Sequence, residues 1–164
     1  MENFKETVMF RKMRRFKQQL TTEECEKILC IGKRGVLALL GDEDYPYAVP
    51  LNYVYDSGCL YFHSAKEGHK LDALKACDKA SFNILGEPRL SDDGWSYFFD
   101  SVTVFGRLRI VADEMEKTDK LRLLGQKYFP TREMVESDIA KNADRCAVIE
   151  LKIEHMTGKH VHER

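Results

Sequence analysis

The stretch PYAVPLNYVYDSGCLYFHSAKEGHK, residues 46–70, carries most of the information about the fold. Residues 45–55 are rich in aromatic and β-branched side chains, which are typical of strands. Pro46 and Pro50 lie within this run. Because proline has no N–H to donate to a strand ladder, we expect this strand at the edge of a sheet, at a bulge or at an exposed mouth.

The second half of the same stretch predicts a hairpin followed by a helix. Asp56-Ser57-Gly58 is typical of a tight turn between antiparallel strands, and the next strand is expected over residues 59–63. A short helix is expected over residues 66–76, and it would cover one mouth of a small barrel.

Outside residues 46–70, turn signals and changes of hydrophobic period mark the remaining elements. Thr21 and Glu24 form a capping box at the start of the first helix, and Gly106 predicts a bulge or bend in a long strand. The sequence thus predicts an α+β domain with six antiparallel strands. Besides those above, the expected elements are helices over 22–31, 113–129 and 132–140, and strands over 34–40, 79–85, 97–111 and 145–154.

Composition narrows the class of protein without naming a function. The 164 residues fit one domain, 1–164, with a basic N-terminal arm over 1–19 that we expect to be solvated, although it could bind a polyanion. The formal charge of −1 argues against a nucleic-acid partner. No apolar run approaches the roughly 20 residues of a membrane helix, and no signal peptide is visible. We therefore expect a cytoplasmic protein whose five cysteines are reduced.

The turn from the strand over 59–63 into the following helix is a candidate phosphate site. Ser64 offers a hydroxyl, His69 and Lys70 offer charge, and a helix N-terminus presents free N–H groups to an anion. No Walker loop is present. The alternative is an ordinary solvated turn.

The strand interrupted by proline is a second candidate, for binding a planar heterocycle. Asn52 carries both donors and acceptors that could pair with the edge of such a ring, although a purely structural role is the alternative. His63 ends the neighbouring strand beside the candidate phosphate site, so the two segments could line one cleft. No cluster has the spacing of metal ligands, so no metal is expected.

Four segments resemble one known family. PYAVPLNYVY, LYFHSAKEGHK, SVTVFGRLRI and MTGK occur in this order, and the resemblance covers roughly residues 12 to 160. They resemble the nitroimidazole-resistance (Nim-type) branch of the pyridoxamine 5′-phosphate oxidase-like family. The resemblance implies a six-stranded antiparallel split β-barrel with flanking helices. It also implies a homodimer that binds FMN at the subunit interface.

The resemblance also assigns roles to individual residues. Related oxidases have arginine where this chain has His69. His63 would be the catalytic residue, as a proton donor or by orienting the substrate. The cofactor contacts would be Ala48, Val49, Pro50, Leu51 and Asn52 along the isoalloxazine ring, His63 and Ser64 near the ribityl chain and phosphate, His69 and Lys70 at the phosphate, and Ser101 and Val102 from the partner subunit.

The function implied by this resemblance is that of an FMN-dependent oxidoreductase. It would use electrons from NAD(P)H to reduce nitroaromatic (5-nitroimidazole-like) or other small aromatic substrates. The loop over residues 87–99, with Trp95, would line the substrate side together with the partner's surface. Pyridoxamine phosphate oxidation is not expected, because the basic C-terminal part of those oxidases has no counterpart here. The alternative is a non-enzymatic flavin- or haem-binding protein on the same fold.

Overall fold

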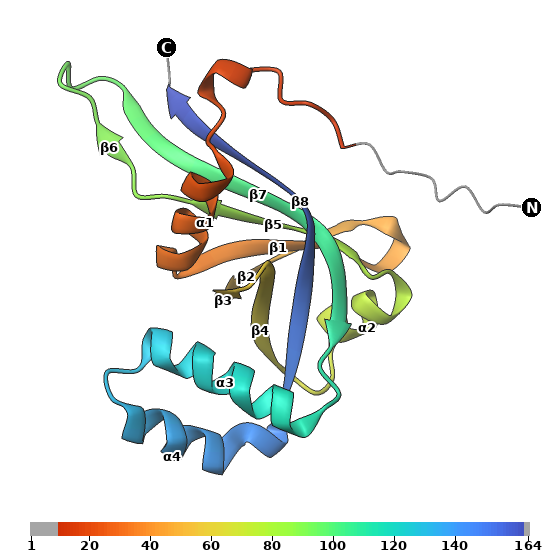
Figure 1. Cartoon of the computed structure of the whole chain (residues 1–164). Coiled ribbons are helices and arrows are strands. Elements are labelled where there is room, and N and C mark those ends of the chain that lie inside the picture. The colour runs from red at the N-terminus through yellow and green to blue at the C-terminus, as the bar shows by residue number, and fades with distance from the viewer. Residues whose placement is uncertain (1–9, 163–164) are drawn as a thin grey trace, which may run out of the picture.

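The computed structural model describes residues 10–162, which form one curled sheet with helices around it (Figure 1). The strands are β1 (Arg34–Leu40), β2 (Pro46–Asn52), β3 (Val54–Asp56), β4 (Cys59–Ala65), β5 (Lys79–Leu85), β6 (Arg89–Leu90), β7 (Tyr97–Ile110) and β8 (Cys146–His162). The helices are α1 (Thr22–Ile31), α2 (His69–Ala76), α3 (Glu114–Tyr128) and α4 (Arg132–Asn142), with short 3₁₀ turns η1 (Phe16–Gln18), η2 (Asp42–Asp44) and η3 (Ala143–Arg145).

The order of the strands shows that the sheet is a split barrel. It runs β2-β1-β5-β7-β8-β4-β3, with β6 paired to β7 outside this path, and the neighbouring strands are antiparallel. β2 and β3 are at opposite ends of this order, yet only Tyr53 separates them in the chain. The sheet must therefore curl until its two edges approach each other. The predicted α+β split barrel is confirmed, and the expected edge position of the proline-containing strand is also confirmed for β2.

The described residues contain eight strands where six were predicted. β6 lies in the segment predicted as a loop, and the predicted strand over 45–55 is divided at Tyr53. The Tyr53 N–H donates to Tyr128 Oη at 2.9 Å, and the Tyr128 hydroxyl lies 2.8 Å from the Tyr53 carbonyl oxygen. Because a side chain from α3 satisfies the backbone of Tyr53, the chain can leave one edge of the sheet and join the other.

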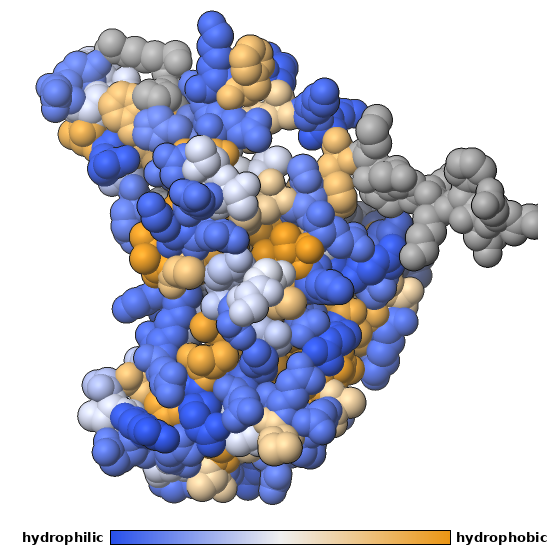
Figure 2. Space-filling model, in the orientation of Figure 1, coloured by the Kyte–Doolittle hydropathy of each residue, from blue (hydrophilic) through white to orange (hydrophobic). Residues whose placement is uncertain are grey.

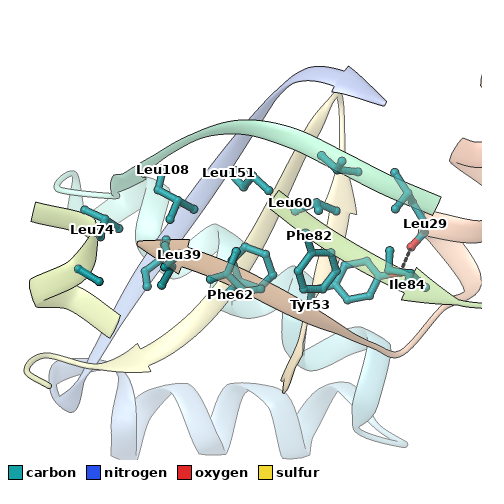
Figure 3. Close-up of a cluster of buried hydrophobic side chains, with 14 of the residues drawn as sticks. Leu29, Leu39, Tyr53, Leu60, Phe62, Leu74, Phe82, Ile84, Leu108 and Leu151 are labelled. Carbon is teal, nitrogen blue, oxygen red and sulfur yellow. Dashed lines mark hydrogen bonds between the residues drawn. The ribbon is translucent and has the colours of Figure 1, made fainter. Parts of the chain in front are cut away.

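The core fills the barrel from α2 at one end to α1 at the other (Figure 3). Leu74 of α2 lies near Leu39 at one end of the cluster. At the other end the buried Tyr53 hydroxyl donates to the Leu29 carbonyl of α1 at 2.8 Å. The prediction that the helix after β4 covers one mouth is confirmed. This helix begins at His69, three residues later than expected.

Two local predictions from sequence are confirmed by the backbone. Thr21 and Glu24 form the capping box of α1, and the helix has the predicted bounds. The pairing of β7 with β8 shifts register between Phe105 and Gly106. A Cβ atom at Gly106 would lie 2.0 Å from the Lys152 carbonyl oxygen, so the two strands approach here as only glycine permits.

The last strand extends well beyond its predicted end. β8 continues to His162 because the 14-residue β7 supplies backbone partners along this whole length. The segment Thr157–His162 is polar enough to resemble a tail, but its backbone pairs with Phe98–Thr103. Long-range pairing therefore overrides the local pattern.

The α3–α4 hairpin lies below the barrel in the view of Figure 1 and contacts β4 and β8. Lys120 of α3 forms an ion pair with Asp56 at 2.8 Å, and Arg109 of β7 bridges Glu116 of α3 and Glu150 of β8. On the face shown in Figure 2, apolar residues form separate patches within a largely polar surface. No helix in the described part of the chain is long and apolar enough to cross a membrane.

Candidate functional site

The start of α2 presents backbone donors with no side-chain cap. Gly68 precedes the helix with φ of 117°, a backbone conformation that glycine adopts readily. Its carbonyl oxygen accepts from the N–H groups of Leu71 and Asp72, at 2.9 and 3.2 Å. The N–H groups of His69 and Lys70 precede these bonds and have no partner within the helix, so they are available to an anion.

Lys70 is half-buried beside these donors. Burial lowers the pKa of its ammonium group, because removal from water disfavours the charged form. Among residues 10–162 the structure gives it no ion pair and no hydrogen bond. Ser64 is 8% exposed and faces the barrel interior, opposite to His63 on the same strand.

His69 connects the start of α2 to β2. Its ring stacks on Tyr47, with ring centroids 4.1 Å apart, and its Nε2 lies 3.6 Å from a carboxylate oxygen of Asp42. The candidate phosphate segment therefore lies directly beside the residue that precedes Ala48. An anion bound at His69 would replace Asp42 as the partner of this ring.

β2 presents alternate residues to the two faces of the sheet. Ala48 and Pro50 are exposed, whereas Val49 and Leu51 pack against the core. Asn52 ends the strand half-buried, and its Oδ1 accepts from Arg34 Nε at 3.2 Å. β2 is an edge strand, so it also has unpaired backbone groups. Small exposed side chains and free backbone groups suit a flat ring.

Asn52 and His63 line the same pocket, which lies between the barrel and the α3–α4 hairpin. The cavity measures about 200 Å³. His63 is exposed on the outer face of β4, opposite Val148 in register. The rest of the lining comes from the turn between the helices (Phe129), from the segment entering β8 (Ala143, Cys146), from α3 (Leu121, Leu124, Gly125, Tyr128) and from α4 (Val135, Asp138, Ile139, Asn142).

Ser101 and Val102 do not join this group within one chain. They lie on β7, which is separated from β2 by β1 and β5, a distance of about 14 Å at the usual strand spacing. Val102 is fully buried in the core, and its carbonyl oxygen accepts from Asn83 at 3.4 Å. The sequence prediction places both residues at the flavin of a second subunit, so their part in the site depends on a partner.

The loop that contains Trp95 lies far from the pocket in the same chain. Trp95 lies just before the first residue of β7. His63 lies at the other end of this strand: it is opposite Val148 in register, and the Val148 carbonyl oxygen accepts from the N–H of Val111, one residue beyond the end of β7. Fourteen strand residues span about 45 Å. None of residues 87–99 lines the pocket, so the expected contribution of this loop to a substrate site, together with the partner's surface, stays a prediction.

Sequence reasoning missed the α3–α4 side of the pocket. Four lining residues of each helix recur with spacings of three, four and seven, and this pattern predicts a helix face that packs on a core. Only the helical spacing from Leu121 to Tyr128 and from Val135 to Asn142 could have indicated these lining residues. This spacing does not distinguish a helix face that lines a pocket from one that packs on a core. Among the described residues no three His, Cys, Asp or Glu side chains lie close enough together to hold a metal ion.

One family model matches most of the chain. The family described as pyridoxamine 5′-phosphate oxidase matches residues 21–160, which include every candidate site residue. No curated protein sequence matches the chain significantly.

Several solved structures share the fold. One is a protein from Bacteroides thetaiotaomicron ascribed to 5-nitroimidazole antibiotic resistance (22% identity, TM-score 0.74, covering 88% of this chain and 87% of that one). A second is the flavocytochrome Anf3 from Azotobacter vinelandii (20% identity, TM-score 0.77, covering 92% and 72%). A third is an FAD-binding protein from Mesorhizobium loti (25% identity, TM-score 0.60, covering 88% and 97%).

Proposed function

The chain belongs to the pyridoxamine 5′-phosphate oxidase-like family, and from this premise we propose that it is a flavin-dependent oxidoreductase. The similar structures include an FAD-binding protein and a flavocytochrome, which supports flavin binding on this fold. We propose FMN as the flavin. One observation carries the proposal: Lys70, half-buried and without a counter-ion among the described residues, lies at an uncapped helix start beside β2.

The start of α2 would hold the phosphate. The free N–H groups of His69 and Lys70 and the charge of Lys70 are suited to charge-assisted hydrogen bonds with phosphate oxygens. His69 would contribute through its ring, in place of the arginine of related oxidases. Ser64 faces inward on β4, so it would reach a phosphate only at the rim where this strand ends.

β2 would hold the ring system. Ala48 and Pro50 present small side chains, and Asn52 has an amide NH₂ group with no hydrogen bond among the described residues. Val49 and Leu51 would contribute through backbone groups, since their side chains pack on the core. Ser101 and Val102 would approach from the second subunit of a homodimer, and the expected dimer is part of this proposal.

A flavin, when bound, supplies the hydride chemistry of the reaction, and the protein positions it. His63 lies beside Asn52 at the pocket, so it would donate a proton to a substrate or orient it. An imidazole is suited to this role because its usual pKa is near neutrality. We propose NAD(P)H as the electron source and small nitroaromatic compounds, such as 5-nitroimidazoles, as substrates.

The visible spectrum of the purified protein tests the flavin. A yellow protein, or a colourless one that acquires a flavin spectrum on addition of FMN, supports the proposal, whereas a colourless protein that ignores FMN and FAD contradicts it. Bleaching of the bound flavin by NADH or NADPH without oxygen, and recovery of the colour on addition of a nitroaromatic, tests the reaction. A flavin that binds but does not react with any donor or acceptor would instead identify a flavin carrier.

A further inference from the structure

The pocket beside His63 is formed mainly by two helix faces. α3 and α4 approach closely, because a Cβ atom at Gly125 would lie 2.6 Å from a methyl carbon of Val135. This contact sets the width of the hairpin, and the pocket lies between the hairpin and the barrel. Its volume of about 200 Å³ exceeds the roughly 150 Å³ of a protein cavity that binds benzene. We expect one substituted aromatic ring to fit this space and two fused rings to fit it less well.

The two sides of the pocket differ in polarity. The helices supply aliphatic walls such as Leu121 and Ile139, and the hydroxyl of Tyr128 is already engaged with the backbone of Tyr53. At the barrel side, His63 and the Asn52 amide NH₂ group have no hydrogen bond with other described residues. A ring between the helices could therefore direct one polar substituent toward this pair.

The side chains that line the pocket also carry a negative charge. Asp138 accepts from Asn142 at 2.8 Å through one carboxylate oxygen, and it is the only carboxylate among the lining residues. The lining contains no Lys and no Arg. On the barrel side, the Arg34 guanidinium lies next to the lining, because its Nε donates to Asn52 Oδ1 at 3.2 Å. A carboxylate or phosphate placed on the Asp138 side would therefore be repelled, while an uncharged ring would not be.

We propose that the α3–α4 hairpin forms the substrate pocket and that Asp138 selects against anionic aromatic rings. The inference rests on the proposed function, because the flavin would lie on the other side of His63 and Asn52. Specificity then depends on the helices, whereas cofactor binding depends on β2 and the start of α2. The phosphorylated substrates of the oxidases after which the family is described would not suit this pocket.

Three probes of different charge and size test the pocket directly. Nitrobenzene is neutral, 4-nitrobenzoate is its anionic counterpart, and 1-nitronaphthalene has a second ring. Binding is measured by saturation-transfer NMR and titration, with flavin-loaded and flavin-free protein. We expect nitrobenzene to bind at least threefold more tightly than 4-nitrobenzoate, and 1-nitronaphthalene to bind weakest despite its larger apolar area.

Two variants assign the binding to this pocket. Ile139→Trp fills the space between the helices and should weaken nitrobenzene binding at least tenfold. Met134→Trp, on an exposed part of α4 outside the pocket, is the matched control and should leave binding unchanged. Asp138→Asn changes only the charge, and it should reduce the preference for nitrobenzene over 4-nitrobenzoate.

The outcomes separate this inference from the proposed function. If nitrobenzene binds with the expected preferences while FMN does not bind, the pocket stands and the flavin proposal fails. If FMN binds but Ile139→Trp binds nitrobenzene as tightly as the wild type does, the pocket proposal is overturned. Equal binding of all three probes, or a preference unchanged in Asp138→Asn, also overturns it.

Discussion

The helices at the two ends of β2 each hold a half-buried lysine, but only one of these two lysines has partners among the described residues. Lys127, near the end of α3, donates to the Leu29 carbonyl oxygen at 3.5 Å, and its Nζ lies 4.1 Å from the ring centre of Tyr53. Lys70, at the start of α2, has no comparable partner among residues 10–162. Burial lowers the pKa of both groups. Lys127 therefore has partners within the fold, whereas Lys70 is suited to bind an anion.

This difference separates two kinds of binding. In the proposed function, recognition at the α2 end would depend on charge and on free backbone donors. At the α3 end, recognition would depend on the shape of an apolar pocket with His63 and Asn52 on one side. We expect substitutions at one end to change cofactor affinity and substitutions at the other to change turnover or stability.

The largest expected effect is on turnover, at the α3 end. His63→Ala should lower turnover with a nitroaromatic substrate about 10²–10⁴-fold, the usual contribution of a positioned acid or base. Flavin affinity should not change, because the proposed flavin contacts lie on β2 and at the start of α2, whereas His63 lies on β4. Steady-state kinetics and flavin titration of the same preparations measure both quantities. Loss of the flavin from this variant would show that His63 is a cofactor contact.

His69→Ala is the matched comparison at the α2 end. This variant should weaken flavin binding while the flavin-loaded fraction keeps its turnover. If both histidine variants change the same quantity, the separation between the two ends is wrong.

The next effect is on cofactor affinity. Lys70→Ala should weaken FMN binding by about 1.5–3 kcal/mol, or roughly 10–150-fold in Kd, because it removes one charge-assisted hydrogen bond to the phosphate. Quenching of flavin fluorescence gives the two constants. Lys75→Ala is the control, since Lys75 lies exposed on the same helix and pairs with Asp72. Unchanged affinity in Lys70→Ala would place the phosphate elsewhere.

The sequence suggests a site at the α2 end and none at the α3 end, for a physical reason. The segment from His63 to Lys70 is local, so a strand end, a glycine and two basic residues together indicate anion binding. The pocket joins Asn52 to Asp138, which lie 86 positions apart by their numbers, through helix packing. Helix periodicity shows that a face is buried but not what it is buried against.

The elements of the fold also divide into those with local sequence signals and those that depend on distant residues. α1, β1 and β5 have their predicted bounds because their signals are local: a capping box, an apolar run and the turn Gly86-Glu87-Pro88 that ends a strand. The division at Tyr53 and the extension of β8 to His162 could not be predicted. One depends on the distant Tyr128 and the other on the length of β7.

The third effect is on stability, where α3 joins the barrel. Tyr128→Phe should lower the free energy of unfolding by about 1–3 kcal/mol, since it leaves the buried backbone groups of Tyr53 without a partner. Urea denaturation measures this change. Tyr45→Phe is the control, because Tyr45 is 74% exposed. A loss of FMN affinity in folded Tyr128→Phe would show that the two ends are coupled through Tyr53.

The smallest effect is a pH dependence that tests the structural role of Lys127. Burial lowers its pKa to about 8, whereas an unfolded lysine titrates near 10.4. Between these values the unfolded state binds more protons than the folded state, so this group makes stability rise with pH. The raised pKa of Tyr55, about 12, acts in the opposite direction above pH 10. The contribution of Lys127 to the pH dependence of stability must therefore be measured as the difference in the free energy of unfolding between wild type and Lys127→Met.

The free energy of unfolding of the two proteins is compared at pH 7 and pH 9.5. The free energy of unfolding of wild type, relative to that of Lys127→Met, should rise by about 1–2 kcal/mol over this interval. A difference that does not vary with pH would mean that Lys127 is solvated like a surface lysine. The two lysines would then differ only in whether the ammonium group has a partner within the fold, and not in burial.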